Sequence, residues 1–425
     1  MANNSSIWKN AVFMRMFSSY SISMLGRWFD MVAIMILFGY VWETDPLTIA
    51  LIPVMYALPH ALLSQFAGIL ADRFNKGKLM MIADVGTAVL TIVLAMAPGP
   101  WLALPILLLR ATLTVIHFPA QQALIKHVVE ENLIVKAVTL NGTVNEFTKI
   151  MGPILGGSLA AIFSPRLCIL INAAAYFISA LILLSIIKKK EVETSRLAEV
   201  EAGNKVSFWQ SWKDGWSMVL SSKILVVAVT FSLLGMTAIQ MTDVQITVLL
   251  REVAPERPEM IGWVMASSGA GALAVMMVMN RFKKITYYGV LIGSSFLLIG
   301  VPFGMLGTLE TGVQSFVLTG LGFAAGIGIG IYTIVISYIL QKETGRENIG
   351  RVSGIYNSLS GMVVLGAPLL GGMLVGLFDV RLVYLGVGLS LSLIGLTSAL
   401  LQQVLWQKNE GISVKKVTVG MKSYE

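Results

Sequence analysis

The sequence predicts an all-α membrane protein with twelve transmembrane helices in two pseudo-symmetric six-helix bundles. Three observations predict it: a very apolar composition, twelve apolar runs of membrane-spanning length, and motifs that recur in both halves. The 425 residues are 56% hydrophobic and 13% charged, with a mean hydropathy of +0.78, whereas soluble domains carry about 25% charged residues. This composition excludes a soluble enzyme, a coiled coil and a disordered scaffold, and the single cysteine excludes a disulfide framework within the chain.

The first half of the chain contains six apolar runs. A bilayer core about 30 Å thick needs about 20 apolar residues per helix. Because lipid offers no partner to backbone polar groups, each run is expected to be helical. Residues 1–13 hold no apolar stretch ahead of the first run, so no cleavable signal peptide is expected. The six runs are 14–41, 47–71, 79–97, 101–125, 133–161 and 165–187.

A long polar stretch separates these runs from six more. It begins with three lysines and carries three tryptophans at helical spacing, which is typical of an amphipathic helix on a membrane surface. The chain therefore divides into an N-terminal six-helix bundle (1–187), a cytoplasmic linker with an amphipathic helix (188–221), and a C-terminal six-helix bundle with a cytoplasmic tail (222–425). The second set of runs is 222–249, 258–280, 285–306, 313–339, 349–377 and 382–406.

The basic residues are distributed unevenly between the two sides of the membrane. With twelve spans, 24 of the 31 lysines and arginines fall in the N-terminal segment, alternate loops and the C-terminal tail, and four fall on the opposite side. The positive-inside rule then places both termini in the cytoplasm of a cell (plasma or inner) membrane protein. This bias explains the net charge of +8 without any nucleic-acid partner.

Two motifs repeat between the halves. A proline followed by a glycine pair occurs at Pro153 and again at Pro368, 215 residues later. The sequence Ala-Asp-Arg-Phe at 71–74, after the second run, is matched by Met-Asn-Arg-Phe at 279–282, after the eighth. A duplicated six-helix unit is typical of transporters in which two halves rock around a central site.

Over essentially its whole length the chain resembles the major facilitator superfamily. The loop after the second run, Gly-Ile-Leu-Ala-Asp-Arg-Phe-Asn-Lys-Gly-Lys from Gly68, is similar to the family's cytoplasmic signature, with Asn75 where a second glycine is usual. Arg110 stands where the family carries an intramembrane arginine, and Thr114 replaces the glycine that usually follows. The sequence near Arg110, with Phe-Pro-Ala at 118–120, looks most like the macrolide-efflux branch of the drug:proton antiporters.

The resemblance implies a conformational latch in the loop after the second run. In the family such loops hold the halves together in the outward-open state, and the acid interacts with the start of the next helix, typically for about 0.3–1 kcal/mol at exposed sites. The alternative is an ordinary positively charged cytoplasmic loop. The residues that carry the latch motif here are Gly68, Asp72, Arg73, Lys76 and Lys78.

The fifth run carries a motif similar to the antiporter signature of the family. It comprises Gly152, Pro153, Gly156 and Gly157, with Thr148 in place of the leading glycine. Proline lacks an amide donor and clashes with the preceding helical turn, whereas the glycine pair allows close helix approach. The motif is therefore expected to form a hinge or seal between the halves, or else a packing feature that both halves share.

Charged residues within the runs are the candidates for proton coupling or substrate binding. A charge at mid-membrane costs at least about 2.5–3.5 kcal/mol on insertion scales, so each needs a partner or water. Two pairs are three residues apart on one helix face, so self-neutralised structural pairs are the alternative. These pairs are Arg27 with Asp30 and Glu146 with Lys149.

Asp30 is the first choice for proton binding because burial and a nearby arginine act in opposite directions on a carboxyl group. In the family, spans one, four, seven and ten line the cavity, which implies that Asp30, Arg110 and Asp243 surround one space. Asp84 is expected to pair with loop basics near the inner end of its span. His60 and His117 are expected to be core histidines, with a proton relay as the less favoured alternative.

No motif for covalent chemistry is present in the sequence. The chain lacks the phosphate-binding glycine-lysine loop of ATP-driven proteins, zinc-ligand spacings and a nucleophile elbow. We therefore expect no enzyme activity, no cofactor and no metal.

The sequence thus predicts a secondary active transporter that exports a small amphipathic compound or drug, such as a macrolide, by proton-coupled antiport and alternating access. Its expected partners are a small-molecule substrate, protons and the lipid bilayer, and a monomer is the default of the family. One alternative is an exporter or flippase of a natural metabolite such as a siderophore or lysolipid. Another is a membrane sensor that does not transport.

Overall fold

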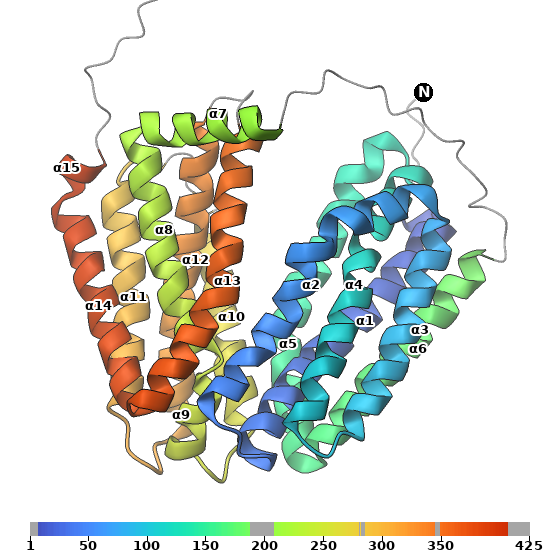
Figure 1. The fold of residues 1–425 in the computed structure, drawn as a ribbon, viewed down its shortest axis with the longest axis horizontal. Helices are drawn as coiled ribbons and strands as arrows, with labels where there is room; N and C mark the ends of the chain where they lie inside the picture. The colour runs from blue at the N-terminus through green and yellow to red at the C-terminus, as the bar shows by residue number, and fades with distance from the viewer. Residues whose placement is uncertain (1–6, 188–207, 280, 282–284, 345–348, 407–425) are drawn as a thin grey trace, which may run out of the picture.

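The computed structural model describes residues 7–187, 208–279, 281, 285–344 and 349–406, which contain helices and no β-strand (Figure 1). The first half begins with a short 3-10 helix, η1 (Ile7–Lys9), and its longer helices are adjoined by a π-helix, η2 (Leu37–Val41), and a second 3-10 helix, η3 (Glu131–Leu133). Those helices are α1 (Ala11–Ile36), α2 (Pro46–Arg73), α3 (Lys76–Ala95), α4 (Pro100–Val128), α5 (Ile134–Ile162) and α6 (Pro165–Ile187).

The second half forms a separate group of helices beside the first (Figure 1). Part of the predicted linker forms the helix α7 (Phe208–Ser221), which lies across one end of this group and packs on α8 and α13. The remaining predicted linker residues, 188–207, and the tail, 407–425, lie outside the described residues. The other helices are α8 (Lys223–Asp243), α9 (Ile246–Val253), α10 (Met260–Met279), α11 (Tyr288–Gly307), α12 (Ser315–Glu343), α13 (Ile349–Leu377), α14 (Val380–Leu400) and α15 (Gln402–Leu405).

Eleven helices within the described ranges are long and apolar enough to cross a membrane. The remaining predicted span is α5, a 29-residue helix whose charged side chains include Glu146 and Lys149. The predicted run 222–249 is wrong in one respect, because the chain leaves the helix at Val244 and Gln245 and starts the short helix α9. The apolar residues of α9 are buried between the halves, which explains why they extended the run.

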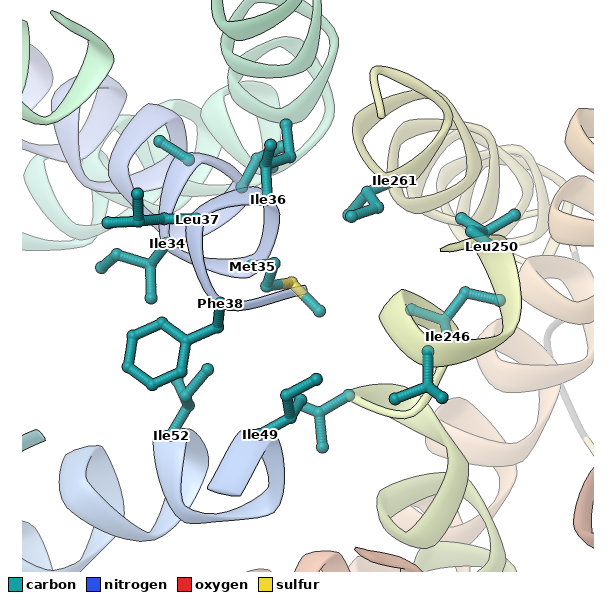
Figure 2. Close-up of a cluster of buried hydrophobic side chains, with 14 of the residues drawn as sticks. Ile34, Met35, Ile36, Leu37, Phe38, Ile49, Ile52, Ile246, Leu250 and Ile261 are labelled. Carbon is teal, nitrogen blue, oxygen red and sulfur yellow. The ribbon is translucent and has the colours of Figure 1, made fainter. Parts of the chain in front are cut away.

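Among the described residues, the apolar core that the two halves share lies at one end of the molecule (Figure 2). There, residues 34–38 at the end of α1 and the start of η2, together with Ile49 and Ile52 of α2, lie opposite Ile246 and Leu250 of α9. Ile261 of α10 completes the contact. Two further apolar clusters each belong to a single half. The cluster in the second half includes Val219 of α7. The molecule is therefore joined between halves at the α9 end, and its halves separate toward α7 (Figure 1).

Candidate functional site

Hydrogen bonds across the boundary reinforce the apolar contact at the α9 end. Arg251 Nη1 donates to the carbonyl oxygens of Gly39 and Thr44, at 3.0 and 3.3 Å. Gln245 and Tyr40 likewise each donate from a side chain in one half to a backbone carbonyl of the other. Because the acceptors are backbone carbonyls, this closed end depends on the local backbone geometry of both halves.

We expect Arg251→Met to destabilise this closed end. The variant keeps the length of the side chain but loses two donors, and hydrogen bonds of charged groups contribute about 1.5–3 kcal/mol. Thermal unfolding of the purified protein measures the effect. The matched control is Arg381→Met, because Arg381 Nε pairs with Glu252 Oε2 at 3.5 Å within the same half and both groups are partly exposed. Equal losses in the two variants would contradict the role of Arg251.

The glycine pair of the antiporter-like motif has two packing partners. A Cβ on Gly156 would lie 2.9 Å from the Cα of Phe29 in α1, so this glycine permits close packing within the first half. A Cβ on Gly157 would lie 3.1 Å from the Cα of Gly262 in α10, so this glycine permits contact with the second half. The helix α5 continues through Pro153, and the glycines around the proline pack against α1 and α10.

The equivalent pair in the second half is arranged in the same way. Gly371 of α13 packs against Met241 of α8 in its own half. Gly372 packs against the start of α2, with a Cβ placed 3.0 Å from the Cα of Leu47. In both halves the first glycine therefore contacts the first long helix of its own bundle, and the second glycine contacts the second long helix of the other bundle. The motifs that repeat around Pro153 and Pro368 therefore each place one glycine in contact with the opposite half at the closed end.

A cavity of about 600 Å³ lies between the halves and is lined by both of them. Its wall includes Trp28, Tyr56 and His60 from the first half and Gln240 and Leu365 from the second. The indole nitrogen of Trp28 is buried without a hydrogen-bond partner within the described structure, so a donor is available in this wall. We call this space the central cavity.

A buried ion pair lies at the wall of the central cavity. Arg110, which lines the cavity, donates from Nη2 to Asp30 Oδ2 at 2.7 Å and from Nη1 to Asp30 Oδ1 at 3.4 Å. The two side chains are only 4% and 2% exposed. The alternative interpretation, a self-neutralised pair of Arg27 with Asp30, does not hold here, because Asp30 faces α4 and Arg27 points into the cavity, where it is exposed.

The other pair considered as an alternative, Glu146 with Lys149, also does not form within the described residues. Glu146 accepts a hydrogen bond from Asn145 at 3.1 Å, and no ion pair joins it to Lys149 within the described residues. Both line a second cavity of about 300 Å³, which shares Trp28, Met31 and Asp243 with the central cavity. Lys149 of the first half and Asp243 of the second therefore line the same cavity. Four of the six candidates therefore line these two cavities as exposed or half-buried groups, and the other two form the buried pair.

Asp84 is placed differently from the prediction. Instead of meeting basic residues of a loop, it is 1% exposed and faces His117, with 3.3 Å between Asp84 Oδ1 and His117 Nε2. This approach is close enough for an ion pair but is not aligned as a hydrogen bond. Ser179 of α6 donates to the other carboxylate oxygen. This cluster could not be predicted from the sequence, because its members come from separate helices and no spacing links them.

The latch residues lie at the end where the halves separate. A Cβ on Gly68 would meet no other atom within 4 Å, and Arg73 and Lys78 are exposed. Asn75 begins α3 as its cap, accepting from the amide of Lys78 at 3.0 Å, so this turn needs no second glycine. Lys76 is half-buried, and Asp72 lies in the last turn of α2, although its side chain is outside the described structure. The latch stays a prediction.

Within the described ranges, no three histidine, cysteine, aspartate or glutamate side chains gather to hold a metal ion. A nucleoside transporter, NupG, has a similar structure, with a TM-score of 0.69, 14% sequence identity, and coverage of 93% of this chain and 99% of that one. This similarity confirms the predicted fold.

Three curated relatives are similar in sequence. The chain is 28% identical to YfiS, an uncharacterised MFS-type transporter of Bacillus subtilis, over 90% of this chain and 91% of the relative. It is 24% identical to the staphyloferrin A transporter of Staphylococcus aureus, over 68% and 72%. It is 22% identical to macrolide efflux protein A of Enterococcus faecalis, over 72% and 94%.

The model of the Major Facilitator Superfamily matches residues 16–254, more than half of the chain. Together with the helical fold and the repeated halves, this match identifies a multi-pass membrane transporter, and the family is not one of enzymes. The similarity to macrolide efflux protein A confirms the resemblance to that branch. The chain belongs to the major facilitator superfamily.

Proposed function

We propose that this transporter exports a small amphipathic compound, such as a macrolide, by alternating access, and that protons entering the cell drive the export. The structure then represents the state open to the cytoplasm. Two observations support this orientation: the halves are joined at the α9 end, and the excess of lysine and arginine belongs to the opposite end.

The observation that carries the proposal is the buried pair of Asp30 and Arg110 at the cavity wall. An ionised Asp30 neutralises Arg110, and this pairing is required because an isolated charge in the membrane interior is costly. A proton on Asp30 removes the negative charge and leaves the guanidinium to find another acceptor or water. Proton binding at Asp30 therefore changes the charge of the cavity wall, which links the proton to the conformations of the two halves.

Export by living cells tests the proposal. A drug-sensitive bacterial strain that expresses the chain is expected to accumulate less labelled erythromycin than the same strain with an empty vector. A protonophore is expected to abolish the difference, because it collapses the proton gradient without touching the protein. Equal accumulation with and without the chain, for macrolides and for lipophilic cations, would contradict export of this class of compound.

A natural metabolite that carries a carboxylate is the second candidate substrate. Arg27 favours it, because its guanidinium is exposed in the central cavity with no carboxylate within 4 Å in the described structure. The similarity to the staphyloferrin A transporter is a further reason to consider it.

We expect Arg27→Gln to discriminate between the two candidates. The variant removes a cation from the cavity, so it should weaken binding of an anionic substrate while leaving a cationic macrolide unaffected or better bound. Competition by citrate-based siderophores and by erythromycin for the purified protein measures both affinities. A parallel loss for the two ligands would contradict a charge-selective role for Arg27.

A further inference from the structure

A second buried titratable pair, Asp84 with His117, lies in the first half, apart from the pair at the central cavity. Ser179 donates to Asp84, and because a hydroxyl group has a single proton, Ser19 is the donor in its 2.6 Å contact with Ser179. Helices α1, α3, α4 and α6 thus converge on one carboxylate. The imidazole beside this buried carboxylate and the chain of hydroxyl donors stabilise its negative charge.

The pair opens onto a small cavity of its own. This cavity, of about 150 Å³, is lined by Asp84, His117, Thr87 and Gln121 among others. Its volume is several times the roughly 10–15 Å³ that one water molecule requires. The hydroxyl of Thr87 and the Nε2 atom of His117 are buried without a hydrogen-bond partner in the described structure, so they are available to bind such water.

The small cavity adjoins the central cavity. Five residues line both of them: Met24, Arg27, His60, Thr114 and Tyr176. A proton that reaches the central cavity from water therefore has a short polar route to the pair.

We propose that Asp84 and His117 form a second proton-binding site, which loads and empties through the small cavity. With one proton between them the two groups are together neutral, as carboxylate with imidazolium, because the hydroxyl donors hold Asp84 as a carboxylate. Release of that proton to cavity water leaves a single negative charge on Asp84. The other titratable or charged side chains that line this cavity are Tyr20, Arg27, His60 and Tyr176.

The site differs in kind from the pair of Asp30 and Arg110. Arginine stays charged in proteins, so protonation of Asp30 leaves a net positive charge, whereas histidine exchanges its proton in the physiological range. All the groups that hold Asp84 belong to the first half, so loading this site breaks no contact between the halves. The role of this site in coupling rests on the proposed proton-driven export. In that cycle, the site carries one additional proton per transport event.

Nuclear magnetic resonance of the protein in lipid nanodiscs, with its histidines isotope-labelled, tests proton binding without a substrate. The chain has three histidines, so its nuclear magnetic resonance spectrum is simple, and His117→Gln identifies the signal of His117. Acidification from pH 8.5 to 5.5 is expected to convert this signal from the neutral to the charged form in the wild type and in Asp30→Asn. In Asp84→Asn it is expected to stay neutral, because a buried imidazolium would then lack its anionic partner.

The proposal is overturned if the His117 signal stays neutral in the wild type or responds identically in Asp84→Asn. Asp84→Glu, which keeps the charge, is expected to retain the response, and this distinguishes loss of the charge from disruption of the fold. His127→Gln, elsewhere on α4, is the control that leaves the response intact.

Proton and erythromycin fluxes in proteoliposomes separate this proposal from the proposed function. If the wild type moves protons against erythromycin, Asp84→Asn is expected to move one proton fewer per drug molecule, and an unchanged ratio would overturn a role in coupling. If the wild type moves erythromycin without protons, the proposed coupling fails, while the His117 spectrum still decides whether the site binds a proton.

Discussion

Asp30→Asn is expected to abolish the uphill export of a macrolide while preserving its downhill exchange. The asparagine keeps the shape of the side chain but cannot take up and release a proton. The proton gradient can therefore no longer drive transport of the substrate. Proteoliposomes measure both properties: accumulation under an imposed pH gradient, and exchange of labelled for unlabelled erythromycin without a gradient. Uphill export at the wild-type rate in Asp30→Asn would contradict the assignment.

Stability measurements separate coupling from folding in this variant. Loss of one partner of a buried ion pair costs about 3–5 kcal/mol, because the other charge is left uncompensated. Asp30→Asn and Arg110→Gln are therefore each expected to lower the Tm, and the double variant is expected to recover most of the loss. Export that returned together with stability in the double variant would show that the pair is structural only.

Gly157→Leu is expected to hold the closed end of the transporter open. The added side chain would meet Gly262 of the opposite half, where the backbones are in contact, and overpacking of this kind costs about 1–3 kcal/mol. Opening this end relieves the clash, so the population shifts toward the outward-facing state. Gly372→Leu is expected to act in the same way because it meets the start of α2.

Cysteine labelling detects this shift. In a background with Cys168→Ser, which removes a buried thiol, a reporter Met31→Cys lies between the two cavities. A membrane-impermeant maleimide added outside is expected to label the reporter in the Gly157 and Gly372 variants and not in the parent. Gly376→Leu is the control, one turn further along α13, with nothing within 4 Å of the added Cβ. Labelling in the control, or none in Gly157→Leu, would contradict the seal.

The fold was predictable from the sequence because membrane insertion imposes a length and a polarity on every span. The repeated proline and glycine pairs lie where the two bundles meet, and the second glycine of each pair contacts the other half. The end of α8 was not predictable, since the residues of α9 are as apolar as a span. They are apolar because they are buried between the halves rather than in lipid.

The candidate residues could be named from the sequence, but the contacts between them could not. Intramembrane charges are costly, which is sufficient reason to select Asp30, Arg110 and Asp243. Which side chains pair depends on how each helix is rotated about its axis relative to its neighbours. The sequence of a single helix does not determine this rotation. Spacing along α1 therefore left Arg27 as an alternative partner of Asp30, whereas packing of α1 against α4 pairs Asp30 with Arg110. Asp84 was misassigned for the same reason.

Proton movement in everted membrane vesicles tests the central claim most directly. Vesicles that contain the wild-type chain are energised to form an acidic interior, and a fluorescent pH probe follows the gradient while erythromycin is added. The drug is expected to collapse the gradient partly in wild-type vesicles and to leave it unchanged in Asp30→Asn vesicles. An identical collapse in both, or drug uptake by wild-type vesicles with no change in the gradient, would contradict proton-coupled export through Asp30.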